Sequence, residues 1–219
     1  MKQARVLRAL SCALAIFPAG CATLKHHATT SAAPPPQSYF SPPTPGEQLR
    51  RVALLPLHSE TYPEQYLRAL DATFLAELSK RALFEVVPVS RAQMESLFGE
   101  RHFSSTELLP ADALKRLRDQ CGVDSVLFTD LTHFSPYRPV SMGVRTKLIA
   151  VGTGQIRWAF DYIFDAGNSP VAEAAKRFQV TCSNEHQPLA TDGGSILLSP
   201  VRFAKYVASE TYASLRQND

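Results

Sequence analysis

Between residues 144 and 164 the chain alternates apolar and polar side chains in a pattern that severely restricts how it can fold. One side of an expected strand carries Val144, Thr146, Leu148 and Ala150, and the other side carries Arg145 and Lys147. A turn at residues 152–154 precedes a run in which alternate positions are apolar or aromatic: Ile156, Trp158, Phe160, Tyr162 and Phe164. Because side chains alternate across a strand with a period of two, this pattern predicts an antiparallel hairpin whose aromatic face must be covered.

The first half of the domain predicts a parallel unit instead. Residues 51–57 are almost continuously apolar, which is typical of a short strand buried on both faces. Apolar residues then recur at spacings of three and four, which predicts a helix, at Leu67, Leu70, Phe74, Leu78 and Ala82. Residues 84–89 form a second expected strand. A strand, a crossover helix and a strand in this order imply parallel neighbours joined by a right-handed connection.

The remaining elements complete a mixed α/β fold. Ser90 and Gln93 form a capping-box pair for a short helix through Phe98, followed by a polar loop over 99–109. A helix near residues 110–122 and a strand around 126–128 come next. Ser169-Pro170 and Ser199-Pro200 then begin two further helices, with the expected inward residues Val171, Ala174, Ala175 and Phe178 in the first and Val201, Ala204, Val207, Ala208, Thr211, Tyr212 and Leu215 in the second. We therefore expect a mixed sheet with a parallel start and an antiparallel C-terminal hairpin, covered by helices.

The N-terminus has the layout of a bacterial export signal. Lys2, Arg5 and Arg8 precede an apolar run over residues 9–19. That run of about 11 residues is too short for a permanent span, which needs roughly 20. A signal that is removed is therefore the favoured interpretation, and an ordinary apolar N-terminal helix is the alternative.

Ala19-Gly20-Cys21 resembles the lipobox of bacterial lipoproteins, although Pro18 stands where that family usually has an aliphatic or small residue. The resemblance implies that the Cys21 thiol receives a diacylglyceryl group and that cleavage makes Cys21 the new N-terminus. Ala22 stands where an Asp would favour retention in the inner membrane, which favours the outer membrane. Cleavage without lipidation is the alternative. Attachment through more than one acyl chain holds a protein stably at a bilayer.

Residues 22–49 are rich in proline, serine, threonine and alanine, which predicts a tether. Fully extended at about 3.1 Å per residue, it would reach roughly 85 Å. His26 and His27 lie in this tether without a neighbouring Cys or carboxylate, so we interpret them as solvated residues and not as a metal site. The predicted organisation is a signal peptide over 1–20, a lipidated Cys21 with its tether over 21–49, and a periplasmic α/β domain over 50–219.

Charge argues against a nucleic-acid partner. The chain has 23 Lys and Arg against 20 Asp and Glu, and three of its cations lie in the predicted signal. The mature chain would therefore be neutral, with no basic cluster to attract a polyanion.

Two motifs resemble a known group of periplasmic domains. Residues 51–57 are similar to the opening strand of domains related to the curli-secretion lipoprotein CsgG, to the lipoprotein LpoB and to the N-terminal domain of TolB. Residues 144–158 are similar to the hairpin of the same group. The resemblance implies their α/β fold and a role as an adaptor in envelope assemblies.

The chain departs from the channel-forming relatives in that group, which insert two hairpins of membrane-spanning strands. Each such strand needs about 9 to 11 residues. The connection over residues 131–141 carries Pro136 and Pro139, and residues 165–169 lead directly into the helix headed by Pro170. We therefore do not expect this chain to build a secretion channel by itself.

Motifs for catalysis are weak. The sequence has no G-x-S-x-G elbow, no phosphate-binding glycine loop and no H-E-x-x-H helix. Cys182 and His186 could form a nucleophile and base or two metal ligands, but they lack a third partner. Asp124 and Asp130 are interpreted as strand ends that meet solvent, and Gly193-Gly194 as a flexible loop. We expect no enzyme, no cofactor and no metal.

Cys121 and Cys182 are the cysteines that remain once Cys12 is removed with the signal and Cys21 is acylated. An oxidising periplasm would allow a disulfide between them. Both are expected on or beside apolar helix faces, where an unpaired cysteine is a common small core residue, so unpaired thiols are favoured.

These observations together predict a non-catalytic outer-membrane lipoprotein, attached through Cys21, whose domain binds another periplasmic protein or a second copy of itself. One alternative is an accessory subunit of a curli-like secretion or fibre-assembly system. A rival from a different class is a small periplasmic hydrolase or metal-binding protein that uses Cys182 and His186.

Overall fold

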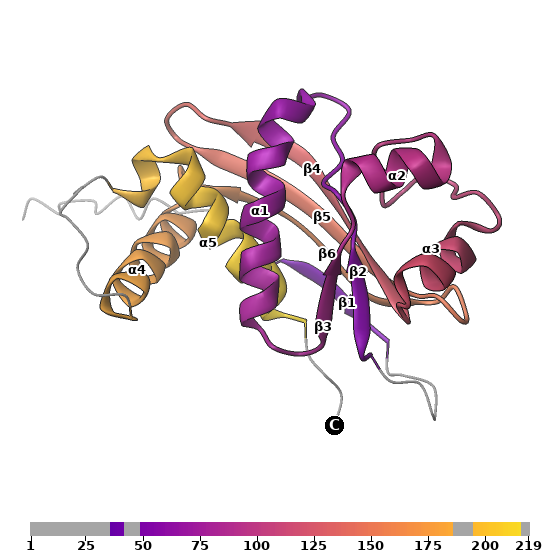
Figure 1. The fold of residues 1–219 in the computed structure, drawn as a ribbon. Helices are drawn as coiled ribbons and strands as arrows, with labels where there is room; N and C mark the ends of the chain where they lie inside the picture. The colour runs from indigo at the N-terminus through magenta and orange to yellow at the C-terminus, as the bar shows by residue number, and fades with distance from the viewer. Residues whose placement is uncertain (1–35, 42–48, 186–194, 216–219) are drawn as a thin grey trace, which may run out of the picture. The chain divides into compact units, whose positions relative to one another are not determined.

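The computed structural model describes residues 36–41, 49–185 and 195–215 of the chain. Figure 1 shows the order of the elements. They are β1 (Gln37–Phe40), β2 (Arg51–Leu54), α1 (Glu64–Lys80), β3 (Glu85–Pro88), α2 (Arg91–Phe98), α3 (Ala113–Cys121), β4 (Ser125–Ser135), β5 (Ser141–Ala150), β6 (Ile156–Asp165), α4 (Ser169–Glu185), a short 3-10 turn (Ile196–Leu198) and α5 (Pro200–Ala213). None of the helices in these ranges combines the length and the apolar content that crossing a bilayer requires.

The strands form one mixed sheet in the order β1-β6-β5-β4-β2-β3. β2 pairs in parallel with β3 on one side and with β4 on the other. The β4–β5, β5–β6 and β6–β1 pairs are antiparallel. The parallel β2–α1–β3 unit and the antiparallel β5–β6 hairpin confirm the mixed α/β class that the sequence predicts.

The register of the β5–β6 hairpin explains one difference from the predicted aromatic face. Leu148 lies opposite Trp158, but the next pair is Ile149 with Ile156, so one extra residue is inserted in β6. This bulge moves Ile156 away from the aromatic face, and its side chain is 37% exposed. The prediction that Ile156 shares that face was therefore wrong, whereas Trp158, Phe160 and Phe164 are buried on it as expected.

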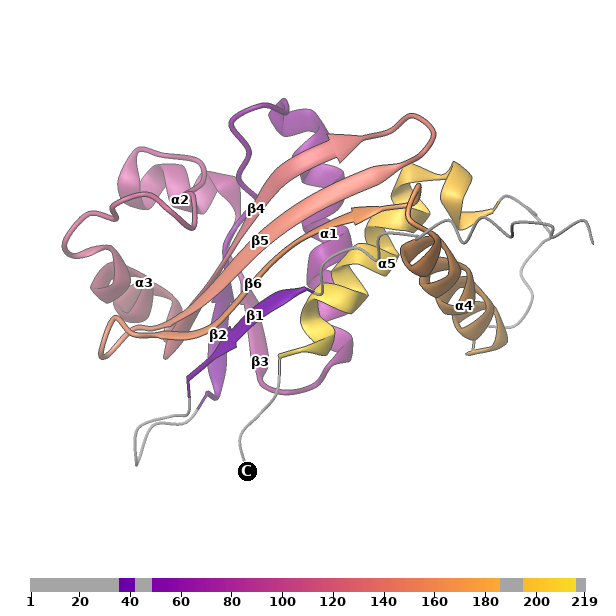
Figure 2. The same ribbon diagram turned by 180° about the vertical axis from the view of Figure 1, so that it is seen from behind.

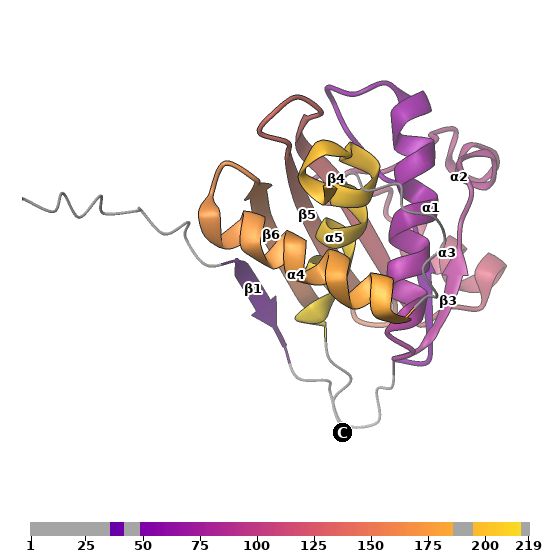
Figure 3. The same cartoon turned by 90° about the vertical axis from the view of Figure 1, so that its left-hand side faces the viewer.

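Helices α1, α4 and α5 cover one face of the sheet, as Figures 1 and 3 show. Aromatic side chains fill the space between these layers: Phe74, Trp158, Phe160, Phe164, Phe203, Tyr206 and Tyr212. The predicted start of α5 is confirmed, because the Ser199 side chain caps it. Val201 was expected to face inward but is 70% exposed, since it lies in the first turn at the end of the helix.

Helices α2 and α3 cover the opposite face at the parallel end of the sheet. The side chains of β2 alternate between the two faces, with Val52 and Leu54 in the large core and Ala53 and Leu55 in the smaller one. Met94 of α2 and Leu117 of α3 pack into that smaller core. On this face no described helix lies across β5, β6 and β1 (Figure 2).

One edge of the sheet comes from the segment predicted as a tether. Residues 37–40 form β1, which pairs with residues 158–161 of β6. All four residues of β1 are exposed. The whole predicted signal and most of the tether, including Cys21 and His26-His27, lie outside the described residues.

The connections after β2 and β3 leave in different directions. The chain goes from β2 into α1 on one face, and from β3 into α2 on the other, before it returns to β4. In open α/β sheets, ligand crevices form outside the carboxyl ends of the strands where the connections diverge in this way. A ligand site is therefore expected at the carboxyl ends of β2 and β3.

Candidate functional site: an arginine-lined pocket between α1 and α2

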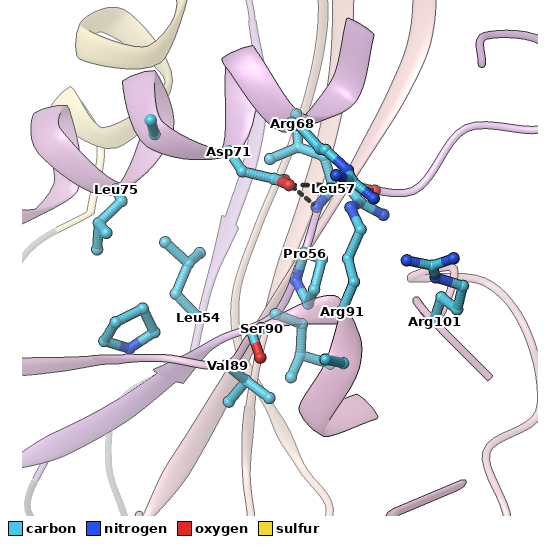
Figure 4. Close-up of a pocket in the computed structure, with 14 residues that line it drawn as sticks. Leu54, Pro56, Leu57, Arg68, Asp71, Leu75, Val89, Ser90, Arg91 and Arg101 are labelled. Atoms are coloured by element: carbon cyan, nitrogen blue, oxygen red, sulfur yellow. Dashed lines mark hydrogen bonds and ion pairs between the residues drawn. The ribbon is translucent and has the colours of Figure 1, made fainter. Parts of the chain in front are cut away.

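A pocket of about 550 Å³ lies at the carboxyl ends of β2 and β3. Figure 4 shows its lining side chains. The lining comes from four places: α1, the end of β2, the end of β3 with the start of α2, and the loop that follows α2. These residues are Leu54, Leu55, Pro56, Leu57, Arg68, Asp71, Ala72, Leu75, Pro88, Val89, Ser90, Arg91, Ala92 and Arg101. We call this site the Arg91 pocket.

Arg91 is the central polar side chain of the pocket. It is the first residue of α2, and its side chain crosses from α2 toward α1 (Figure 4). Its Nη2 donates to the carbonyl oxygen of Leu57 at 2.9 Å and to Oδ2 of Asp71 at 2.8 Å. Oδ1 of Asp71 accepts the backbone N–H of Leu57 at 2.8 Å. These bonds connect α1, the end of β2 and the start of α2 around one guanidinium group.

Arg91 is also under-satisfied. The side chain is 6% exposed, and its Nε and Nη1 are buried without a hydrogen-bond partner in the described structure. A guanidinium group has five N–H donors, and the two on Nη2 are those engaged by Leu57 and Asp71. The donors on Nε and Nη1 are left without an acceptor. Buried donors in native proteins are nearly always paired, so a group like this one calls for an explanation such as a water, an ion or a ligand.

Burial and hydrogen bonding act in opposite directions on the pKa of Asp71. Burial raises the pKa of the Asp71 carboxyl, while the Leu57 N–H and the Arg91 guanidinium act to lower it. Both donors stabilise the ionised form. Asp71 therefore serves Arg91 as a counter-charge and a positioning group.

Two further arginines stand at the exposed rim. The side chains of Arg68 and Arg101 are 64% and 43% exposed. Glu64 contacts both, at 2.7 Å from Arg68 and 3.2 Å from Arg101. The hydrogen bond from Arg68 lowers the pKa of Glu64. Glu95 lies 3.7 Å from Arg101, and like Glu64 it is outside the pocket lining.

The start of α2 adds backbone donors to the pocket. Ser90 caps this helix through a complete capping box with Gln93, as the sequence predicts. The cap satisfies the N–H of Gln93, whereas the N–H groups of Arg91 and Ala92 have no acceptor within the helix. The partial positive charge at a helix N-terminus favours an anion at this position.

The rest of the lining is apolar. Leu54, Leu75 and Val89, together with Pro56 and Pro88, supply carbon surface beside the guanidinium groups. Ser90 is the one hydroxyl-bearing residue in the lining, and its oxygen is engaged in the helix cap. The lining contains no histidine or cysteine that could act as a base or nucleophile. The arrangement therefore offers hydrogen-bond donors and carbon surface together to a partly apolar anion.

A second polar cluster contains His58, the residue that follows Leu57 of the pocket, and it is centred on the carboxylate of Asp130. Asp130, inside β4, accepts the backbone N–H of Ser105 at 3.0 Å and its hydroxyl at 2.6 Å. Ser104 donates a further bond at 3.3 Å, and Nδ1 of His58 lies 3.4 Å from the same carboxylate. We call these four residues the Asp130 cluster. Lys147 donates to the carbonyl oxygen of Ser105 beside it.

The environment of Asp130 corrects the sequence interpretation. Asp130 was interpreted as a strand end that meets solvent, but it is buried, with 4% of its surface exposed. β4 continues to Ser135, and the loop residues Ser104 and Ser105 cover the carboxylate. Asp124, in contrast, does lie at the start of β4, where it accepts the N–H groups of Arg50 and Arg51 at 2.8 and 3.0 Å.

The other candidate residues from the sequence are dispersed. Cys121 ends α3 and Cys182 lies in α4, and no disulfide joins these two described residues. Burial raises the pKa of the Cys121 thiol, which makes it a poor nucleophile. His186 and Gly193-Gly194 lie outside the described residues. Within the described ranges, no group of three or more His, Cys, Asp or Glu side chains is placed to hold a metal ion.

Sequence reasoning did not identify Arg68, Asp71, Arg91 or Arg101. One signal was available, since Arg91 follows the predicted cap Ser90 and comes directly after a predicted parallel strand. The carboxyl ends of such strands are favoured ligand sites. The inward turn of Arg91 toward Asp71 depends on where α1 packs, and the sequence pattern does not report that.

Comparison with known proteins adds similarities of fold. No protein-family profile matches the chain, and no curated protein matches it. Among solved structures, the chain is similar to the PelC dodecamer from Paraburkholderia phytofirmans, with 12% identity over 84% of this chain and 98% of that one and a TM-score of 0.49. It is similar to lipoprotein GNA1162 from Neisseria meningitidis, with 16% identity over 64% and 99% and a TM-score of 0.41. For the LpoB C-terminal domain from Salmonella enterica, identity is 15% over 53% and 82%, and the TM-score is 0.35. These values assign neither a family nor a function to the chain.

Proposed function

We propose that this protein is a lipid-anchored domain of the bacterial cell envelope that binds another protein without catalysing a reaction. The observation that carries the proposal is the Arg91 pocket, which combines an apolar lining with guanidinium groups, and in which Asp71 is paired with Arg91 and the Ser90 hydroxyl is engaged in the helix cap. Arginine is among the residues enriched at the energetic centres of protein interfaces.

The anchor is part of the proposal. The Lys2, Arg5 and Arg8 charges, the apolar run and the Ala19-Gly20-Cys21 sequence support export, cleavage and acylation at Cys21. Ala22 supports the outer membrane as the destination. The proline-rich segment before β1 would then hold the domain in the periplasm at a distance from the bilayer.

The anchor is tested by the mass and location of the protein in its native cells. We expect the mature chain to begin at an acylated Cys21 and to sediment with outer membranes. A Cys21→Ala variant should leave the membrane fraction. An unmodified Cys21 thiol together with an intact Met1 in the wild-type protein would refute the anchor.

The binding role is tested by photo-crosslinking of the lipid-anchored protein in cells. A photoreactive residue at Ala72, which is exposed and lines the pocket, should capture a specific envelope protein. The matched control places the same residue at Val180 on α4, which is 60% exposed and outside the pocket. A protein captured at position 72 and absent at position 180 supports the proposal. Failure to capture any protein at position 72 contradicts it.

A further inference from the structure

We infer that the Arg91 pocket binds a carboxylate attached to an apolar residue, as the C-terminal residue of a partner protein presents it. This inference deepens the proposed function and rests on it for the identity of the ligand as a protein.

The first step is the unpaired donors of Arg91. Nε and Nη1 are buried and lack acceptors, although Nη2 of the same group makes two good bonds. A buried donor without a partner destabilises the protein, and more so when the group is charged. An incoming oxygen anion would offset this destabilisation through charge-assisted hydrogen bonds.

The second step is the sign of the charge that the pocket accepts. Arg68, Arg91 and Arg101 line it with the carboxylate of Asp71, while Glu64 and Glu95, outside the lining, pair with the two rim arginines and leave the buried Arg91 as the cation with unpaired donors. The N-terminus of α2 directs its positive end at the same space, and Ser90, Arg91 and Ala92 all belong to the lining. Both features favour an anion, and neither would favour a cation.

The apolar surface beside Arg91 favours a carboxylate attached to an apolar group over other anions. The surface beside Arg91 is formed by Leu54, Leu75 and Val89 with two prolines. The lining has no side-chain amide, and its one hydroxyl, that of Ser90, is engaged in the helix cap, so the groups that would bind a sugar phosphate are lacking. A volume of about 550 Å³ is within the range of small-ligand pockets and can take the end of a peptide chain. Capture of a terminal carboxylate by backbone donors is an established mode of peptide recognition.

The fourth step concerns access. Nε and Nη1 of Arg91 have almost no exposed surface, so a neighbouring side chain must move before the carboxylate can reach them. Arg68 and Arg101 are the exposed candidates, and both are held mainly by surface ion pairs. Such pairs contribute little stability, so exchanging them for contacts with a ligand costs little.

The test uses the mature lipoprotein in detergent, with ¹⁵N labelling of arginine and of the backbone. The probe is the peptide acetyl-Ala-Ala-Ala-Leu with a free terminal carboxylate, and its control is the same peptide with an amidated end. We expect saturable shifts of the Arg91 Nε–H and Ala92 N–H resonances with the free acid. The amide should bind about tenfold more weakly or worse, because it cannot form the charge-assisted bonds. Equal binding of the two peptides, or no binding of either, would overturn the inference.

Two more probes distinguish the source of the anion. Inorganic phosphate and hexanoate are titrated under the same conditions. If either shifts the Arg91 Nε–H resonance while the free-acid peptide does not, the site takes a different anion and the inference is wrong. Weaker shifts with hexanoate than with the peptide support a peptide terminus.

Matched variants on α1 locate the binding without disturbing the core. Ala72→Asp places a carboxylate in the pocket lining, whereas Ala76→Asp places one on an exposed position one turn later and outside the lining. We expect Ala72→Asp to weaken binding of the free-acid peptide by about tenfold or more and Ala76→Asp to leave it unchanged. Equal effects of the two substitutions would contradict the inference.

The outcomes separate this inference from the proposed function. A protein captured at position 72 in cells, together with equal binding of the acid and amide peptides, would sink the carboxylate assignment and leave the binding role intact. Preferential binding of the acid peptide in detergent, with no protein captured in cells, would support the carboxylate site and refute the protein-binding role.

Discussion

Leu57 of the Arg91 pocket and His58 of the Asp130 cluster are consecutive residues, yet the two regions differ in how far their buried charged group is paired. Both oxygens of Asp130 accept hydrogen bonds from Ser105, and Ser104 and His58 contact the same carboxylate. Arg91 leaves two of its three guanidinium nitrogens unpaired although it is also buried. A buried charge with all its partners inside the domain stabilises the fold, while a buried charge that lacks partners leaves donors for the ligand that we propose. The contrast assigns structure to the first region and binding to the second.

The largest expected effect comes from removing the satisfied charge. Asp130→Ala leaves the buried donors of His58, Ser104 and Ser105 without their acceptor, so we expect the free energy of unfolding to fall by about 3 kcal/mol. Urea denaturation of the mature protein measures it. The control Asp119→Ala removes a carboxylate on the exposed surface of α3, and its effect should stay within about 0.5 kcal/mol. A loss below about 1 kcal/mol for Asp130→Ala would show that this cluster does not hold the fold.

A smaller effect is expected when the under-satisfied charge is removed. Arg91→Met breaks two hydrogen bonds, but it also removes the unpaired donors on Nε and Nη1, and Asp71 keeps the N–H of Leu57. We expect a loss of about 2 kcal/mol in the same urea experiment. The double variant Arg91→Met with Asp71→Leu should lose less than the sum of the two single variants, because both act on one ion pair. A single-variant loss as large as that of Asp130→Ala would remove the distinction between the two regions.

The helix cap beside Arg91 has a smaller effect again. Ser90→Ala removes the side-chain acceptor for the N–H of Gln93, which should lower the free energy of unfolding by about 1 kcal/mol. Ser96→Ala on the exposed face of the same helix serves as the control, with an expected change within about 0.5 kcal/mol. If the two substitutions have the same effect, the capping box does not contribute to the position of α2.

Much of the fold could be predicted because local patterns determine it. The alternation over residues 144–164, the spacing of Leu67, Leu70 and Phe74 and the capping pair at Ser90 all depend on residues that are close in sequence. The bulge between Ile156 and Trp158 and the pairing of β1 with β6 depend on how strands meet across the sheet. Neither leaves a clear local pattern, so both were missed.

The two charged regions show the same limit at the level of sites. A sequence places Asp130 near the end of an apolar run, but its burial depends on a loop that starts more than twenty residues earlier and returns to cover it. Arg91 follows a predicted strand and cap, so its neighbourhood could be anticipated. Which of its nitrogens find partners depends on α1 packing against the end of β2. Unpaired donors are a tertiary property, and only the structure reveals them.

The smallest expected effect is a dependence of stability on pH, which comes from the pair of His58 and Asp130. Asp130 raises the pKa of His58 above its ordinary value, with burial opposing and Glu60 and Glu107 adding smaller increases. His58 and Ser105 outweigh burial and lower the pKa of Asp130. A histidine with a raised pKa stabilises the fold at pH values below its unfolded pKa of about 6.5, and this stabilisation is lost as pH rises through the folded pKa. An aspartate with a lowered pKa stabilises the fold at pH values above its unfolded pKa of about 3.9, and this stabilisation is lost as pH falls through the folded pKa.

The stability difference between the wild type and Asp130→Asn should therefore be greatest between about pH 4 and 6.5, and smaller on either side. Burial lowers the pKa of His102, whose ring lies 4.9 Å from that of His58, and this residue is present in both proteins. Its own dependence on pH therefore cancels to first order in the difference. Urea denaturation at a series of pH values measures the window. The corresponding difference for Arg91→Met should instead decrease as pH falls, because the guanidinium, which stays charged throughout, acts to lower the pKa of Asp71 and of His102. A flat difference for Asp130→Asn would show that His58 and Asp130 do not titrate as a pair.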